Sequence, residues 1–177
     1  MKSLIFSEID HTLTELSNCL AAIDQQDLNT VPFEDSWTAG QLVQHLNMSN
    51  NGFVELLHGP ANDTQRDPGR MVEKIKNGFL DFSTKMKSPE FIVPPEVSYD
   101  KTKLMVTLKG IQNKLLDGIG TLDLTKTCQG FELPVFGALT RLEAVNFVLY
   151  HTQRHIHQFN KIVSALSDNK LHTVLNP

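Results

Sequence analysis

The sequence predicts an all-α protein, a single helical-bundle domain over residues 1–177. Apolar residues recur every three or four positions over long stretches, which is the pattern of helices with one buried face. Prolines and turn-forming residues fall mainly between these stretches. A chain of this length also buries enough surface to fold as one domain without disulfide bonds.

The first helix is expected over about residues 2–26. Its apolar residues share one helical face: Ile5, Ile9, Leu13, Leu16, Leu20 and Ile23. The helix should end before Asp27, Asn29 and Pro32, because these residue types favour turns.

The second helix begins where Ser36 or Thr38 can cap free backbone amides, and it runs to about His58. Gln41 follows Thr38 by three positions, the spacing of a capping box. The inward stripe of this helix contains Leu42, His45, Leu46, Ser49, Phe53, Leu56 and Leu57. One histidine, His45, is therefore expected among core residues.

The third helix is predicted to start after Asp67, with Pro68 in its first turn, where no amide bond is lost. Its buried side is marked by Met71, Ile75, Phe79, Phe82 and Met86. Pro89, Pro94 and Pro95 then rule out a helix between residues 88 and 100. That segment is expected to cross the bundle surface in extended form.

The fourth helix is expected over residues 101–118, with Leu104, Leu108, Ile111 and Leu115 on its buried side. A second long loop follows over residues 119–137, with room for only minor strand-like structure. Thr140 and Glu143 have capping-box spacing and should open the fifth helix, which continues to about Ser167. Glu143 is accordingly interpreted as a capping residue and not as a general base.

Two histidines continue the apolar stripe of the fifth helix. The stripe contains Ala144, Phe147, Val148, His151, His155, Phe159 and Ile162. Residues four positions apart lie on one helical face with Cβ atoms about 6 Å apart, so both imidazoles of this pair can bind one ion. The alternative is that each histidine is a core residue bonded to its neighbours, which is the better explanation for any one of them alone.

Together, His45, His151 and His155 favour a metal site. The predicted core stripes carry no aspartate or glutamate that would pair with buried imidazoles. Three neutral imidazoles from facing helices leave a fourth coordination position to water or substrate, as in catalytic metal sites. The donor set suits zinc, nickel, cobalt, copper or iron.

Composition excludes several classes of partner. The chain has 16 Lys and Arg against 20 Asp and Glu, a formal net charge of -4, which disfavours nucleic acid and anionic membranes. No apolar run approaches the roughly 20 residues of a membrane span, and the N-terminus lacks a signal-peptide core. Cys19 and Cys128 form no CxxC pair, which favours a reducing, cytoplasmic location.

Other residues near the histidines are assigned peripheral roles. Gln158, one turn after His155, is expected to contact a ligand or substrate, or else to bond to another helix. Tyr150 and Arg154 are expected at the rim of the site or at a dimer contact. The remaining histidines are predicted to lie on the surface and not to be ligands: His11, His58, His157 and His172.

Two segments resemble the DinB superfamily. The segment from Trp37 to Leu46 is similar to that family's second-helix motif, in which a tryptophan precedes the helix with the first histidine. Residues 136–140 and the segment from His151 to Gln158 resemble the family's approach loop and HxxxHxxQ helix. The order of these motifs, and their separation by about a hundred residues, make the resemblance fairly specific.

The resemblance implies an up-and-down four-helix bundle with an additional helix and long crossing loops. It also implies a divalent metal, zinc or nickel, on His45, His151 and His155, and a homodimer. Known activities in the family include transferases that use low-molecular-weight thiols. No catalytic residue beyond the metal ligands is assigned.

The sequence is compatible with two functions. We expect a metal-dependent enzyme acting on a small molecule, a thiol transferase or, as a variant, a hydrolase, because a divalent cation lowers the pKa of a bound water or thiol. The alternative is a non-catalytic binding or stress-associated module with a structural or vestigial metal site. The fourth coordination position separates the two, since a protein side chain that closes it would disfavour catalysis.

Overall fold

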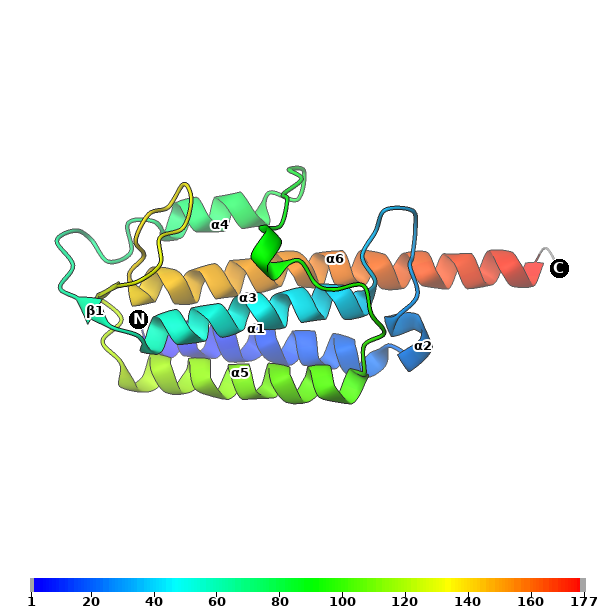
Figure 1. Ribbon diagram of the computed structural model, residues 1–177, viewed down its shortest axis with the longest axis horizontal. Helices are drawn as coiled ribbons and strands as arrows, with labels where there is room; N and C mark the ends of the chain where they lie inside the picture. Colours follow the sequence, from blue (N-terminus) through cyan, green and yellow to red (C-terminus); the bar gives the residue numbers. More distant parts are fainter. Residues whose placement is uncertain (1, 176–177) are drawn as a thin grey trace.

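Four long helices form the bundle that the sequence predicts, in a computed structural model that describes the backbone of residues 2–175 and the side chains of residues 2–170. They are α1 (Lys2–Ala22), α3 (Ala39–His58), α5 (Lys101–Thr121) and α6 (Arg141–Leu175). Figure 1 shows them side by side, with the end of α6 projecting beyond the other three. The all-α bundle prediction is confirmed.

Each long helix packs mainly against two others, because α1 and α3 both lie against α5 and α6. The colours of Figure 1 run in one direction along α1 and α6 and in the opposite direction along α3 and α5. Every helix therefore has one parallel and one antiparallel neighbour. Residues 59–100 allow α5 to run parallel to α3, because this connection returns along the bundle.

Several smaller elements lie outside the four-helix bundle. The helix α4 (Val72–Leu80) packs against α6, and the 3₁₀ helix η1 (Glu90–Ile92) contacts α3. A short helix, α2 (Gln25–Leu28), precedes α3. The strands β1 (Ala61–Asn62) and β2 (Thr127–Cys128) pair in antiparallel fashion, with Ala61 opposite Cys128.

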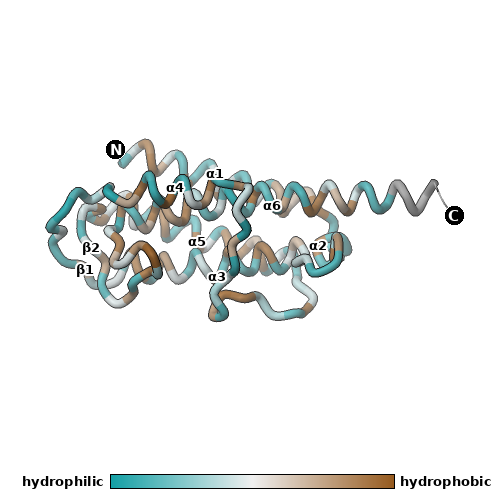
Figure 2. Tube along the Cα trace, turned by 90° about the horizontal axis from the view of Figure 1, so that it is seen from above, coloured by the Kyte–Doolittle hydropathy of each residue, from teal (hydrophilic) through white to brown (hydrophobic). Residues whose placement is uncertain are grey.

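The predicted apolar stripes form the core. All six residues of the first predicted stripe are buried, five of them on α1 and Ile23 just after it, and all four on α5 are buried. Figure 2 shows apolar and polar segments alternating along the helices, as expected when each helix has one buried face. Among the described residues, no helix is long and apolar enough to cross a membrane.

Both predicted capping boxes are confirmed. The Thr38 hydroxyl accepts from the Gln41 backbone N–H at 3.1 Å, and the Gln41 side chain accepts from the Thr38 N–H at 2.9 Å. Thr140 and Glu143 exchange the equivalent pair of bonds, at 3.2 and 2.9 Å. These bonds fix where α3 and α6 begin and hence the helical phase of the residues that follow.

The helix α4 is shorter than the sequence predicts. At its start, the Asp67 carboxylate accepts from the Gly69 N–H at 2.7 Å in a turn, so the helix begins only at Val72. At its end, the Asp81 carboxylate accepts bonds from Ser83 and Thr84, a local turn that competes with a continued helix.

Two residues predicted on the buried side of this helix are therefore exposed. Phe82 is 46% exposed and Met86 is 53% exposed, because both follow the turn at Asp81. Two other boundaries also differ from the prediction. The first helix ends at Ala22, with residues 25–28 forming α2, while α6 continues past Ser167 to Leu175.

Candidate metal centre

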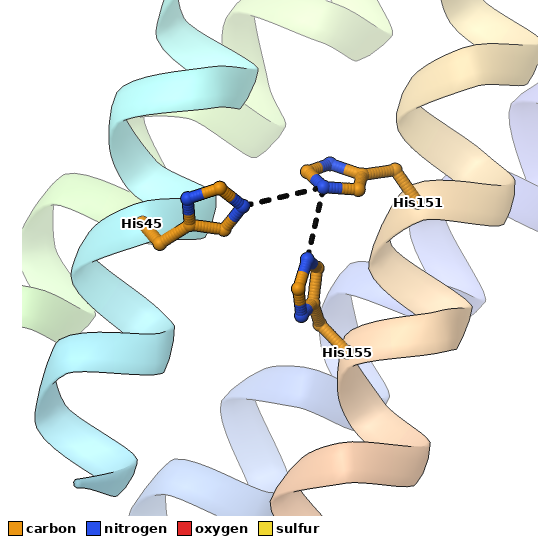
Figure 3. Close-up of side chains that lie close together, drawn as sticks. All are labelled: His45, His151 and His155. Atoms are coloured by element: carbon orange, nitrogen blue, oxygen red, sulfur yellow. Dashed lines mark hydrogen bonds between the residues drawn. The ribbon is translucent and has the colours of Figure 1, made fainter. Parts of the chain in front are cut away.

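Two antiparallel helices present the three histidines to one point. His45 lies two turns after the capping box of α3, and His151 and His155 lie one turn apart on α6. Figure 3 shows the three rings pointing toward one another across the gap between the helices. The side chains are buried, with 3%, 6% and 8% of their surfaces exposed.

The nitrogens that face one another are all Nε2 atoms. The Nε2 atoms of His45 and His151 are 3.3 Å apart, and those of His151 and His155 are 2.9 Å apart. One ring nitrogen from each residue lies within 4.8 Å of the other two. In a tetrahedral site with bonds of about 2.0–2.1 Å, ligand nitrogens lie about 3.3 Å apart. The cluster therefore has the dimensions of a metal site.

The outward-facing nitrogens have their own partners. The Nδ1 of His45 donates to the backbone carbonyl of Ile92 at 2.8 Å, and the Nδ1 of His155 donates to the Oε1 of Gln158 at 2.5 Å. The Ser49 hydroxyl lies 3.5 Å from the Nδ1 of His151. Because a neutral imidazole carries one proton, a proton on Nδ1 leaves the lone pair on Nε2.

This arrangement fits a cation. Two acceptor lone pairs that face each other at these distances repel, and only a proton or a metal ion between them turns the contact into an attraction. The Nδ1 contacts of His45 and His155 favour the tautomer that metal-binding histidines adopt, with the second nitrogen bonded to a carbonyl oxygen. The residues present thus fit a divalent metal held by three Nε2 atoms.

The protein environment keeps these rings neutral. Burial lowers the pKa of His155 to about 3, and the nearby His45 and Arg154 act in the same direction. Burial, followed by the charges of the two other histidines and Arg154, lowers the pKa of His151 well below 6.5. Burial also lowers the pKa of His45, against the opposing effect of its bond to Ile92. Neutral imidazole is the form that binds metal.

Aromatic rings surround the cluster. The Trp37 ring centroid lies 5.1 Å from that of His45, and the Phe79 and Phe147 centroids lie 5.1 and 5.5 Å from that of His151. These rings keep water away from the outer faces of the imidazoles. Within residues 2–170, no further His, Cys, Asp or Glu joins the group of three, so none of these side chains closes the fourth position.

The other residues singled out from the sequence lie in different places. Gln158 contacts the cluster as an acceptor for His155. Arg154 is not at an exposed rim: it is 6% exposed and bonds to backbone carbonyls at the end of α4. Tyr150 is half-buried, and burial together with the charges of Glu8 and Glu73 raises its pKa. Its ring makes no contact with the three histidine rings in the part of the chain whose side chains are described.

The remaining histidines lie outside the cluster. His157 stacks on Phe82, with ring centroids 4.2 Å apart, and His58 donates to the carbonyl of Lys114 at 3.1 Å. His11 lies in a surface groove between α1 and α6. The prediction for His172 falls outside the described side chains.

Sequence reasoning missed the Ile92 carbonyl and Ser49 as partners of the histidines. The first is a backbone carbonyl of η1, in the connection between α4 and α5, and side-chain patterns carry no signal for it. Ser49 lies on the predicted inward stripe one turn after His45, which was the only available indication.

Comparison with known proteins identifies the family. The model of the DinB superfamily matches residues 8–159, which is most of the chain. The chain belongs to the DinB superfamily. The resemblance seen in the Trp37 and HxxxHxxQ segments is thereby confirmed.

Two further similarities agree with this assignment. YuaE, an uncharacterized protein of Bacillus subtilis (strain 168), is 22% identical over 148 residues, covering 84% of this chain and 90% of its own. The solved structure of YfiT from Bacillus subtilis, described as a probable metal-dependent hydrolase with an unusual four-helix bundle topology, matches with a TM-score of 0.60. That match covers 94% of this chain and 87% of YfiT at 14% sequence identity, so it demonstrates a shared fold.

Proposed function

We propose that this DinB-superfamily protein is a metal-dependent enzyme that binds one divalent cation through His45, His151 and His155. The observation that carries the proposal is the convergence of three Nε2 atoms from two helices in a buried cluster. The partners of their Nδ1 atoms favour the tautomer with a free lone pair on Nε2. Zinc and nickel are the expected ions, because both accept imidazole ligands.

When bound, the cation supplies Lewis acidity, which polarises a substrate oxygen and lowers the pKa of a water or thiol. The protein residues position and insulate the site. The Ile92 carbonyl and the Gln158 amide oxygen hold the rings of His45 and His155. Trp37, Phe79 and Phe147 exclude water from the cluster, and low polarity strengthens electrostatic effects there.

Among the described side chains, no fourth His, Cys, Asp or Glu joins the cluster, which favours a catalytic over a structural metal. Structural zinc sites usually have four protein ligands, whereas catalytic sites keep a position for water or substrate. The cluster has three candidate ligands among the described side chains. A site with three protein ligands disfavours the alternative of a non-catalytic module with a structural ion.

The reaction itself stays a prediction. Hydrolysis of a small molecule is supported by analogy with YfiT, described as a probable metal-dependent hydrolase. Transfer of a low-molecular-weight thiol to an electrophile uses the same Lewis acidity and is the second candidate, as the family's transferases suggest. A small-molecule substrate, a homodimer and a cytoplasmic location also stay predictions.

Metal analysis tests the proposal directly. Protein purified without a nickel column should contain close to one equivalent of a divalent metal per chain, and a His151→Ala variant should contain almost none. A His157→Ala variant is the matched control, since His157 is on the same helix but stacks on Phe82 outside the cluster. Equal metal content in the wild type and the His151→Ala variant would refute the site.

Assays of metal-loaded and metal-free protein then separate the two reactions. Ester and amide substrates test hydrolysis, while an electrophile supplied with a low-molecular-weight thiol tests transfer. A hydrolase should act on the first set without added thiol, and a transferase should require the thiol. Absence of activity in both assays, with metal bound, would favour the non-catalytic alternative.

A further inference from the structure

A buried arginine with no role in the proposed chemistry lies next to a candidate ligand. Arg154 precedes His155 on α6 and is 6% exposed. Its guanidinium donates to the carbonyls of Phe79 at 3.0 Å and Asp81 at 2.9 Å, and also to the carbonyl of Thr84. No ion pair involves Arg154 within residues 2–170. Its buried charge is stabilised by these carbonyls.

These bonds join α6 to the end of α4. Carbonyls in the last turn of a helix lack intrahelical partners, and cations are favoured at that end. Arg154 supplies donors to this end and to the turn that follows, where α4 stops at Leu80. One side chain of the ligand-bearing helix therefore fixes the start of the connection between α4 and η1.

At η1, the chain is hydrogen-bonded to α3, the other ligand-bearing helix. We call residues 81–92 the cover segment. At its end, the Ile92 carbonyl accepts from the Nδ1 of His45 at 2.8 Å, and Ser88 lies 3.5 Å from the same nitrogen. Figure 1 shows η1, at the end of this segment, beside the middle of α3 and α6. The segment is thus held by α6 at one end and by α3 at the other.

We propose that Arg154 is a positioning residue that holds the cover segment over the histidine cluster and so controls the entry and exit of metal and small ligands. We call the hydrogen bonds from Arg154 to the carbonyls of Phe79, Asp81 and Thr84 the clamp. The control of metal entry and exit rests on the proposed metal site, whereas the clamp does not. The three histidines are at most 8% exposed, so a molecule that reaches the Nε2 atoms has to displace a neighbouring segment. The cover segment contains no long helix and is mostly exposed. Its displacement from the bundle therefore requires less free energy than displacement of a packed helix.

His45 couples the cover segment to the histidine cluster. Its Nδ1 holds the cover segment while its Nε2 faces the cluster, so one ring links the two. A cation on Nε2 strengthens the Nδ1–H donor and orders the ring. By thermodynamic reciprocity, metal that stabilises the closed cover must also bind more tightly when the cover is closed.

Limited proteolysis of the metal-free protein tests the clamp alone. Lys85 and Lys87 are exposed trypsin sites inside the cover segment. An Arg154→Gln variant should be cut there at least about tenfold faster than the wild type, because it loses charge-assisted bonds to three carbonyls. The matched control is Arg141→Gln, which removes an arginine that bonds to the Gly59 carbonyl from the same helix, away from the histidines.

Metal release tests the consequence. From cobalt-loaded protein, a strong chelator should remove the ion at least about tenfold faster from Arg154→Gln than from the wild type or Arg141→Gln. Arg154→Lys should be intermediate, since an ammonium group does not reproduce the planar fork of a guanidinium. If Arg154→Gln matches Arg141→Gln in both assays, Arg154 has only a general structural role and the inference is overturned.

A measurement on the wild type covers the case in which Arg154→Gln does not fold. Hydrogen exchange of the cover-segment amides should slow on addition of cobalt, with no comparable change at residues 101–121. Unchanged exchange with cobalt bound would overturn the coupling. If cobalt does not bind at all, the proposed function fails, while proteolysis of the metal-free Arg154→Lys variant still decides whether the clamp exists.

Discussion

Arg66 binds both carboxylate oxygens of Glu143, with each contact at 2.6 Å, although Glu143 has no exposed surface. The same carboxylate accepts from the backbone N–H groups of Met71 and Thr140, each at 2.9 Å. One buried charge thereby joins the loop before α4 to the first turn of α6. The side-chain hydrogen bond to Glu143 also raises the pKa of Arg66.

The first prediction concerns this pair. Arg66→Gln should lower the free energy of unfolding by about 2–3 kcal/mol, because it leaves a buried carboxylate without its counter-charge. Since Arg66 is 25% exposed, the loss should fall below that of a fully buried pair. Urea denaturation at pH 7 measures it. Lys126→Met, which breaks the exposed pair with Asp63, is the control and should leave stability almost unchanged.

A second prediction concerns the hydrogen bond from His155 to Gln158. Gln158→Leu should weaken metal affinity about 10- to 100-fold, because His155 loses the acceptor that orients its ring. Gln158→Glu should retain or increase affinity, since a carboxylate accepts more strongly. Calorimetric titration with zinc measures both. Gln153, on the same helix, donates to the Thr12 hydroxyl, so Gln153→Leu should bind zinc like the wild type. Equal zinc affinities for Gln158→Leu and Gln153→Leu would contradict the prediction.

The third prediction is a pH dependence of the metal-free protein. The folded-state pKa of His155 is about 3, below the value of 6.5 expected in the unfolded chain. The unfolded state therefore binds more protons between these values, so stability is complete above pH 6.5 and falls as the pH drops toward 3. Urea denaturation at pH 7.5, 6.5, 5.5 and 4.5 measures the slope.

The comparison with His155→Gln isolates this residue. Carboxylates contribute to both proteins in the same way, so the variant, which lacks the His155 imidazole, should lose less stability than the wild type over the same pH range. His151 has a lowered pKa from the same causes and keeps part of the slope in the variant. Parallel pH profiles for the two proteins would rule out the assigned pKa of His155.

A fourth prediction separates two glycines of α5. At Gly118, an added Cβ would lie 2.6 Å from the Cδ2 of Leu57 and 3.0 Å from the Nε2 of His58, so Gly118→Ala should destabilise the protein by about 1–3 kcal/mol. At Gly110, apart from the adjacent residues and the backbone of the helix itself, no described atom lies within 4 Å of the added Cβ, and Gly110→Ala should stabilise the protein by about 0.5–1 kcal/mol. Thermal denaturation distinguishes the two. Equal effects would mean that α3 and α5 are not in close contact at Gly118.

The elements that depend on local contacts could be predicted from the amino-acid sequence. The apolar stripes of α1, α3, α5 and α6, and the capping boxes at Thr38 and Thr140, involve residues three or four positions apart. The same periodicity placed His45 on the inner face of α3 and His151 and His155 on that of α6. The helical face on which each histidine lies therefore follows from the sequence alone.

How the histidines are held and covered depends on contacts between segments that are far apart in the sequence. The turn at Asp81 ends α4 early, Arg154 bonds to the backbone carbonyls there, and the Ile92 carbonyl accepts from His45, which is 47 positions away in the sequence. Backbone carbonyls are the same in every residue, so no side-chain pattern marks which of them will accept a bond. Their partners are set by how the helices pack and where the connecting segments return, and that information is in the fold.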